Sequence, residues 1–311
     1  MSRKFVPIVV FLALSFGLSW LFALPLWLSD GLASPFFLVV AIAVMATPAI
    51  AALVVVFFVE KHPAKGARRR ALGLGSVRPV GRFIGYLGLA MFVPPALILA
   101  ALLVGTAFGL YPADFVNFSG FQETIDAQLE AVGQATLPIP IGLLVALQFV
   151  NVLIGSIINI IPALGEELGW RGWLLPKLLP LGLVPALLIS GVIWGLWHAP
   201  LILLGYNYGN VPGWLALAAM VGMTTVIGAV FSWLRIRSES VWPAALAHGS
   251  FNAAAGFSLV FVMAGESFDP LQATILGWSG WLVPLGLVIA LFATGQFRVP
   301  VTESASVTDA E

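Results

Sequence analysis

Long apolar runs dominate the chain and are separated by short polar or charged segments. Runs of about 18 or more apolar residues are typical of helices that cross a lipid bilayer. The pattern predicts an all-α polytopic membrane protein with one transmembrane domain, residues 1–298, and a disordered polar tail, residues 299–311. Within that domain the candidate chemistry falls at about 139–264. The eight expected spans lie at about residues 5–29, 35–59, 83–110, 139–164, 184–204, 214–234, 241–264 and 275–294.

Basic and acidic residues fall on opposite sides of these spans. The loop at 111–136 carries four acidic residues and no Lys or Arg. The segment between the second and third spans is instead cationic, with Lys61, Lys65, Arg68, Arg69, Arg70, Arg78 and Arg82. The positive-inside rule places this cationic segment in the cytoplasm. Alternation through eight spans then places both termini in the cytoplasm and the acidic loop outside.

Composition narrows the class of protein further. The chain is 60% hydrophobic and only 9% charged, far from the usual balance of a soluble domain. It contains no cysteine, which excludes disulfides, thiolate metal sites and thiol nucleophiles. Formal net charge is zero, and nothing supports nucleic-acid binding. We expect a multi-pass protein of the bacterial cytoplasmic membrane.

Six polar side chains stand inside the apolar stretches. Ionisable groups at membrane depth are costly, so they indicate a functional site by default. Two carboxylates, two imidazoles, an amide and a guanidinium together form a set suited to hydrolysis. These residues are Glu166, Glu167, Arg171, His198, His248 and Asn252.

Residue counting allows the six side chains to meet. Glu166 and His198 lie 16 residues on either side of Gly182, so a helical hairpin would bring them to one depth. Glu166 and His248 each lie 11 residues from a basic residue at the cytoplasmic boundary, which corresponds to about 16 Å of helix. Glycines near all three segments would let the helices approach closely. A shared site nearer the cytoplasmic side is therefore expected.

Local spacing suggests different roles for the neighbouring carboxylates. Glu167 and Arg171 are four residues apart in the acid-before-base order that favours a helical ion pair. Glu166 is rotated by about 100° from Glu167 and is left available for chemistry. His248 and Asn252, also four apart, share one helix face. Any of these residues can instead serve as a hydrogen-bonding contact between helices.

The three segments that carry these residues resemble the motifs of the CPBP family of intramembrane endopeptidases. This family comprises CAAX-protease and bacteriocin-processing proteins and is related to the prenyl-protein endopeptidase Rce1. The EExxxR motif matches residues 166–171, and HxxxN matches residues 248–252. The motif with an aromatic residue four positions before a histidine matches Trp194 and His198, although the usual aromatic residue is Phe.

The resemblance implies an endopeptidase whose site opens toward the cytoplasm from within the bilayer. Glu166 would activate the attacking water with assistance from His198. His248 and Asn252 would stabilise the oxyanion, and the supporting residues Glu167 and Arg171 would hold the site together. The implied partners are a protein or peptide substrate at the membrane and the lipid bilayer.

The cofactor question stays open at this point. Glu166, His198 and His248 can bind a divalent metal such as zinc and leave a position for water. A carboxylate base with an imidazole and amide oxyanion site needs no metal. The single-helix HExxH pattern is absent, which excludes a conventional zincin. We favour the metal-free mechanism.

Two other classes of function remain as alternatives. Buried Glu and His also form proton relays in transporters, although here the polar residues are confined to about 165–252 and have no counterpart in the first three spans. A non-catalytic membrane protein that shields partners or gives bacteriocin immunity is the second alternative. Catalytic activity itself, the oligomeric state and the substrate stay open, because prenylated proteins, bacteriocins and other peptides all fit. CAAX cleavage is the least expected of these for a bacterial chain.

Overall fold

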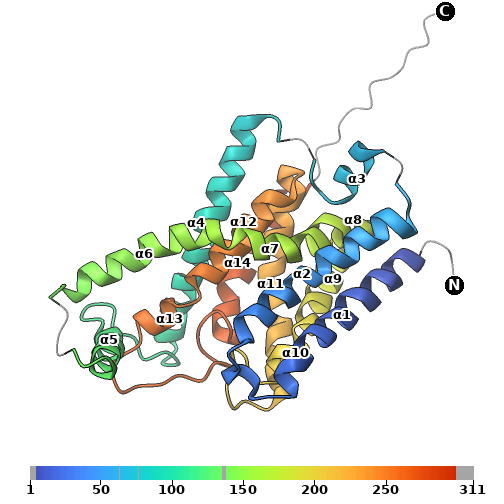
Figure 1. Ribbon diagram of the computed structural model, residues 1–311. Coiled ribbons are helices and arrows are strands. Elements are labelled where there is room, and N and C mark those ends of the chain that lie inside the picture. The colour runs from blue at the N-terminus through green and yellow to red at the C-terminus, as the bar shows by residue number, and fades with distance from the viewer. Residues whose placement is uncertain (1–4, 63, 76, 135–137, 299–311) are drawn as a thin grey trace, which may run out of the picture.

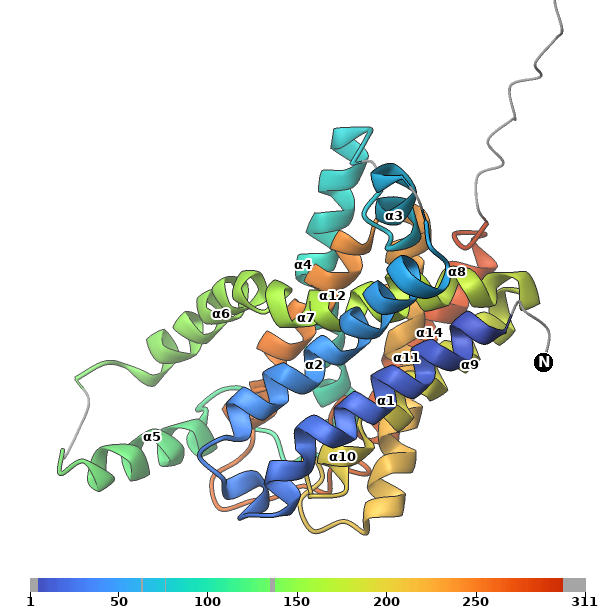
Figure 2. The same cartoon turned by 45° about the vertical axis from the view of Figure 1, so that its right-hand side comes forward.

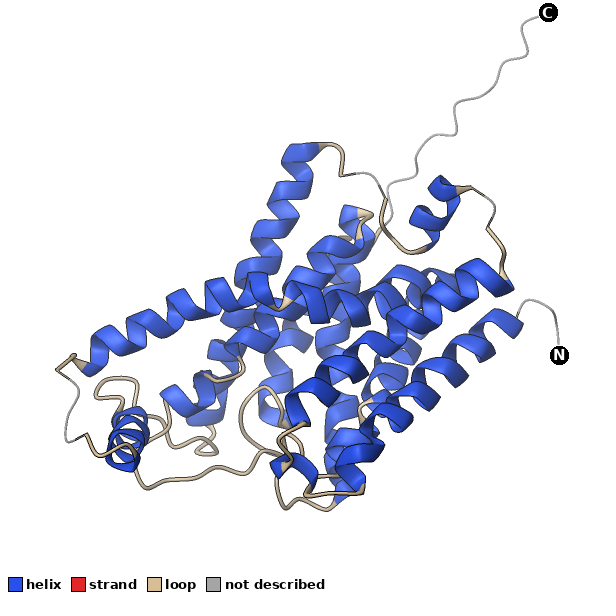
Figure 3. Cartoon of the chain, in the orientation of Figure 1, coloured by secondary structure: helices blue, strands red, loops and turns tan. Residues whose placement is uncertain are grey.

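The computed structural model describes residues 5–62, 64–75, 77–134 and 138–298, and within these ranges it contains helices and loops but no strands (Figure 3). One isolated β-bridge joins Ala113 to Val262. The predicted tail at 299–311 lies outside the described residues. The α-helices are α1 (Val6–Trp27), α2 (Phe37–Val54), α3 (Lys65–Ala71), α4 (Val80–Ala107), α5 (Ser119–Ala131), α6 (Ile141–Ile158), α7 (Ile160–Glu167), α8 (Leu175–Leu178), α9 (Leu183–Trp197), α10 (Ala199–Ile202), α11 (Gly213–Ser238), α12 (Val241–Ala254), α13 (Phe257–Val260) and α14 (Trp278–Ala293). Two short 3₁₀ helices, η1 (Gly31–Ala33) and η4 (Leu179–Leu181), and two π-helical segments, η2 (Val55–Val59) and η3 (Leu168–Leu174), complete the elements.

Each expected span contains a helix, and the all-helical polytopic fold is confirmed. Among the described residues, five helices are long and apolar enough to cross a membrane: α1, α2 with η2, α4, α6 and α11. In the other three expected spans the individual helices are shorter, although α9 and α10 together reach from Leu183 to Ile202 with only His198 between them. α9 and α14 are apolar but have only 15 and 16 residues, and α12 has 14, against about 20 for a full crossing.

A proline explains where the fourth expected span divides. Pro162 has no backbone N–H, so the carbonyl of Ile158, four residues earlier, receives no helical hydrogen bond from it. α6 accordingly ends at Ile158 and α7 begins at Ile160, with Asn159 between them. The chain nevertheless continues in one direction through α6 and α7 (Figures 1 and 2).

The helices surround a central pair, α11 and α12 (Figure 1). α12 is buried along most of its length and contacts α4, α6, α7 and α11, while α9 packs against α11. α1 and α2 run side by side along another flank, and α6 projects away from the bundle in both views (Figure 2). The motif-bearing helices α7 and α12 therefore contact each other at the centre, and α9 joins them through its contacts with α11 and η3.

Glycines permit the close helix contacts that the sequence predicts. A Cβ atom at Gly195 of α9 would lie 2.5 Å from the Cα of Val221 on α11. A Cβ atom at Gly249 of α12 would lie 2.8 Å from the backbone oxygen of Ser156 on α6. Real Cβ atoms do not approach backbone this closely, so larger residues at either position would push the helices apart. The packing that surrounds the site depends on these two contacts.

Candidate active site

The two carboxylates lie at the C-terminal end of α7, where the helix changes to the π-helical segment η3. Glu166 is 2% exposed, and Glu167 and Arg171 are fully buried. A π-helical turn is uncommon and occurs frequently at functional sites. Arg171 lies in this π-helical segment, close to the two acids at the end of α7. The two acids and Arg171 are therefore withdrawn from the surface of the bundle.

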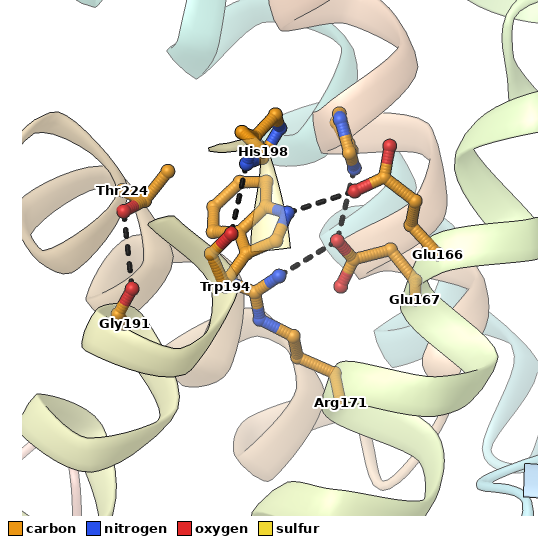
Figure 4. A network of polar contacts seen from close by, with 8 residues as sticks. Glu166, Glu167, Arg171, Gly191, Trp194, His198 and Thr224 are labelled. Carbon is orange, nitrogen blue, oxygen red and sulfur yellow. Dashed lines mark hydrogen bonds and ion pairs between the residues drawn. The ribbon is translucent and has the colours of Figure 1, made fainter. Parts of the chain in front are cut away.

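Glu167 is the hub of the charged groups. Its Oε1 accepts hydrogen bonds from Nη1 of Arg171 at 2.8 Å and from Nδ1 of His248 at 2.9 Å (Figure 4). The predicted pairing of Glu167 with Arg171 is thus observed, and His248 joins it from α12. Oε2 of the same carboxylate is buried without a hydrogen-bond partner among the described residues.

Glu166 has a different partner, which the sequence reasoning missed. The indole Nε1 of Trp194 donates a hydrogen bond to Glu166 Oε2 at 2.7 Å (Figure 4). The usual phenylalanine of this motif cannot make that bond. The substitution of Trp for Phe was visible in the sequence, but nothing there indicated that the indole would reach a carboxylate on another helix.

Aromatic rings enclose the guanidinium of Arg171. Its Cζ lies 4.2 Å from the ring centroid of Trp194 and 5.5 Å from that of Phe231. Cation–π contacts of this kind partly replace hydration in an apolar surrounding. Nε and Nη2 have no hydrogen-bond partner among the described residues. Gly228 on α11 leaves the room required, since a Cβ there would lie 2.7 Å from Nη2.

The two histidines are held through the same ring nitrogen. His198 Nδ1 lies 2.8 Å from the backbone oxygen of Trp194, and because a carbonyl only accepts, this nitrogen carries the proton. In the neutral ring Nε2 is then left as an acceptor. His248 Nδ1 is bound to Glu167, and its ring stacks on Phe231 at 5.7 Å. Both imidazoles therefore keep Nε2 for other contacts.

The structure joins only part of the predicted set directly. Glu166, Glu167, Arg171 and His248 lie in one enclosed cluster around Trp194. His198 is attached through the backbone of Trp194, with the two rings 5.7 Å apart. Asn252 follows one turn after His248 on α12 and is partly exposed, and its side chain makes no hydrogen bond to the described residues.

Comparisons with known proteins cover this same part of the chain. Residues 146–254 match the family model described as type II CAAX prenyl endopeptidase Rce1-like. A CAAX prenyl protease 2 from Methanococcus maripaludis is 27% identical over 150 residues, which cover 47% of this chain and 46% of that protein. Over residues 146–254 the chain is similar to the Rce1-like family. It spans about half the length of that curated relative.

All candidate site residues fall inside the Rce1-like region, 146–254. The family model and the relative both carry the name of a protease. Together with the five long apolar helices, this relation indicates a multi-pass membrane protein.

The Rce1-like region contains side chains of the types that coordinate zinc, but these side chains are not arranged around a common point. Two imidazole nitrogens and a carboxylate are ligands that zinc accepts. In the described part of the chain, however, no group of three or more His, Asp or Glu side chains stands close enough to share a metal ion. Glu166 is hydrogen-bonded to Trp194, and Glu167 to both Arg171 and His248. The described residues therefore do not fit a bound zinc ion.

The four tryptophans of the motif segments are packed in the interior of the protein. Trp170 and Trp173 are fully buried, and Trp194 and Trp197 are each 2% exposed. Their burial assigns these rings to internal packing rather than to an interfacial aromatic belt.

Glu60 is a second residue that the sequence reasoning missed. It follows η2, outside the spanning segments, and accepts hydrogen bonds from Trp173 Nε1 at 3.1 Å and from Lys177. His62 Nε2 lies 3.1 Å from the same carboxylate. Burial alone would raise the pKa of Glu60, but the bonds from Lys177 and Trp173 outweigh it and lower that pKa. Glu60 thus ties the end of the second span to η3 and α8.

Proposed function

We propose that this protein is an intramembrane endopeptidase in which Glu166 activates water to hydrolyse a peptide bond. The observation that carries the proposal is the unequal treatment of two adjacent buried carboxylates. Glu167 is engaged by a guanidinium and an imidazole, whereas Glu166 receives one hydrogen bond from a neutral indole. The relation to proteases of the Rce1-like family supports the same reading.

In the proposed reaction, Glu166 removes a proton from water while the water oxygen attacks the scissile carbonyl carbon. The same proton then passes to the leaving nitrogen as the carbon–nitrogen bond breaks. His198, with Nδ1 held by a backbone carbonyl, assists by accepting a hydrogen bond from the water at Nε2.

The oxyanion requires hydrogen-bond donors. Asn252 supplies an amide N–H, and His248 supplies an Nε2–H when its ring is protonated. Glu167 beside Nδ1 stabilises the positive ring, and Arg171 balances the charge of Glu167. Glu167 and Arg171 thereby act on the position and charge of His248 and do not touch substrate.

The proposed substrate is a membrane-associated protein or peptide reached from the cytoplasmic side, in the cytoplasmic membrane of a bacterium. The name of the archaeal relative supports prenylated CAAX peptides as substrates, which the sequence alone made the least expected of the candidates. Parallel assays with a farnesylated CAAX peptide, its unprenylated form and an unrelated hydrophobic peptide would separate these substrate classes.

Glu166→Gln tests the catalytic assignment. Glutamine keeps an oxygen that can accept the bond from Trp194 but cannot take a proton from water. We expect turnover of a quenched fluorescent peptide in proteoliposomes to fall by at least about 10³-fold, with an unchanged unfolding transition. Equal turnover by parent and variant would overturn the assignment.

The alternative function, a transporter with a proton relay, is tested with His248→Ala. Proton or solute flux that survives in this variant would argue against a relay through that histidine.

A further inference from the structure

The segment that links α2 to α4 carries a cationic helix with no acidic partner. Within its described residues Lys61, Lys65, Arg69 and Arg70 are exposed and form no ion pair. The nearby acid Glu60 is 10% exposed and already bound to Lys177. We call these four cations the α3 basic surface.

The α3 basic surface repels itself. Lys65 and Arg69 are four residues apart on one helix, a spacing at which like charges are destabilising. Lys65 also lies at the N-terminal end of α3, where the helix dipole disfavours a cation. An external anion would relieve both effects.

The surface also lies at the level where a bilayer has its headgroups. The apolar span of α2 and η2 ends at Val59 and the next begins at Val80, so the connecting segment that contains α3 emerges and returns on the same side of the bilayer. Phe58, just before it, and Ile84, just after it, are 71% and 59% exposed. This places α3 beside lipid whichever way the chain is oriented. Both views show α3 standing outside the bundle (Figures 1 and 2).

The loop after α3 reaches the candidate active site. The backbone oxygen of Gly73 accepts a hydrogen bond from Val241 N at the start of α12, the helix that carries His248. The carbonyl of Leu72 packs on Gly172 of η3 so closely that a Cβ there would lie 2.5 Å from it. Because Leu72 and Gly73 contact η3 and α12, an interaction that fixes the position of α3 also restrains these two elements.

We propose that the α3 basic surface binds the phosphate groups of anionic phospholipids, and that this binding supports the active arrangement of η3 and α12. Charge complementarity selects the lipid, since each basic residue near an anionic bilayer adds to its attraction. The link to activity rests on the proposed endopeptidase function, whereas the lipid binding stands independently of it.

The test uses the full chain in nanodiscs of phosphatidylcholine with increasing phosphatidylglycerol. Because the chain has no cysteine, an introduced Ala64→Cys carries the only thiol and takes one fluorophore at the start of α3. Energy transfer to headgroup-labelled phosphatidylglycerol then reports local enrichment of this lipid. Peptide turnover is measured in the same discs.

The paired variant Arg69→Gln with Arg70→Gln should lower the apparent affinity for phosphatidylglycerol about tenfold. The matched control, Arg69→Lys with Arg70→Lys, keeps the charge and should bind as the parent does. Turnover by the parent should rise with phosphatidylglycerol, and that of the Gln pair should not.

Equal enrichment around the Gln pair and the parent would overturn the lipid site. If phosphatidylglycerol is enriched near α3 but peptide turnover does not change with the phosphatidylglycerol content, the link to activity is overturned. A loss of turnover on an acidic peptide alone, with unchanged lipid enrichment, would assign the surface to substrate and overturn the proposal. Absence of turnover under all conditions would instead count against the endopeptidase function, while energy transfer would still decide lipid binding.

Discussion

Acidic residues occupy two contrasting regions of this protein. On α5 and the loop before it, Glu123, Asp126 and Glu130 are exposed, and Asp114 is held by local hydrogen bonds. On α7 the two carboxylates are removed from solvent and are joined to groups from three other elements. Water can replace any one partner in the first region. In the second, removing one partner leaves the others uncompensated.

The largest test of this contrast is Arg171→Met. It leaves the buried carboxylate of Glu167 without its guanidinium, and breaking a buried ion pair from one side costs about 3–5 kcal/mol. We expect a loss of that size in the free energy of unfolding, measured by denaturant titration in micelles. Glu130→Gln on α5, as the matched control, should change it by less than about 0.5 kcal/mol. Similar small effects of both variants would remove the contrast.

Gly228→Ala tests whether the buried cluster tolerates crowding. The added Cβ would lie 2.7 Å from Arg171 Nη2, so the guanidinium must shift from Glu167 and Trp194. Overpacking of this kind costs about 1–3 kcal/mol. The control is Gly286→Ala on α14, where no atom beyond the adjacent residues and the backbone of the same helix lies within 4 Å of the added carbon. A neutral result at Gly228 would mean that Arg171 can move freely.

Trp194→Phe removes the hydrogen bond to Glu166, keeps a smaller aromatic ring beside Arg171, and introduces the residue usual in the motif. Glu166 then lacks its indole donor, and we expect the free energy of unfolding to fall by about 1–2 kcal/mol. Turnover should persist, because the carboxylate itself is unchanged. If the variant folds normally but loses turnover completely, the indole has a more direct part in the reaction than a support for Glu166.

Asp114→Asn gives the smallest effect and depends on pH. Hydrogen bonds, first from the backbone of Asn117 and then from Ser119, lower the pKa of Asp114 to about 2. A carboxyl whose pKa is lower in the folded state stabilises the fold above its unfolded pKa. The difference in melting temperature between parent and Asp114→Asn should therefore be constant above about pH 5 and shrink from pH 4 toward pH 2. A constant difference down to pH 2 would contradict it.

The sequence predicted the helical membrane fold and the Glu167–Arg171 pair because both follow from short-range spacing. Apolar runs define helices, and four residues bring two side chains onto one face. It could not predict that His248 would join Glu167, or that Trp194 would bind Glu166, since both contacts depend on how α9 and α12 rotate against α7. The shortness of α12 was also hidden, because an apolar run continues to Val262 after the helix has ended.

The π-helical turn of η3 has a consequence for how sequences of this type can vary in length. Each i→i+5 bond takes one more residue than an α-helical bond, so η3 behaves as a stretch with a residue inserted into a regular helix. Deletion of one residue between Leu168 and Leu174 would rotate everything after it by about 100°. Glu166 and Glu167 would keep their places, but Trp173 and Lys177 would turn away from Glu60. Length in this short segment is thus as constrained as the identity of the acids before it.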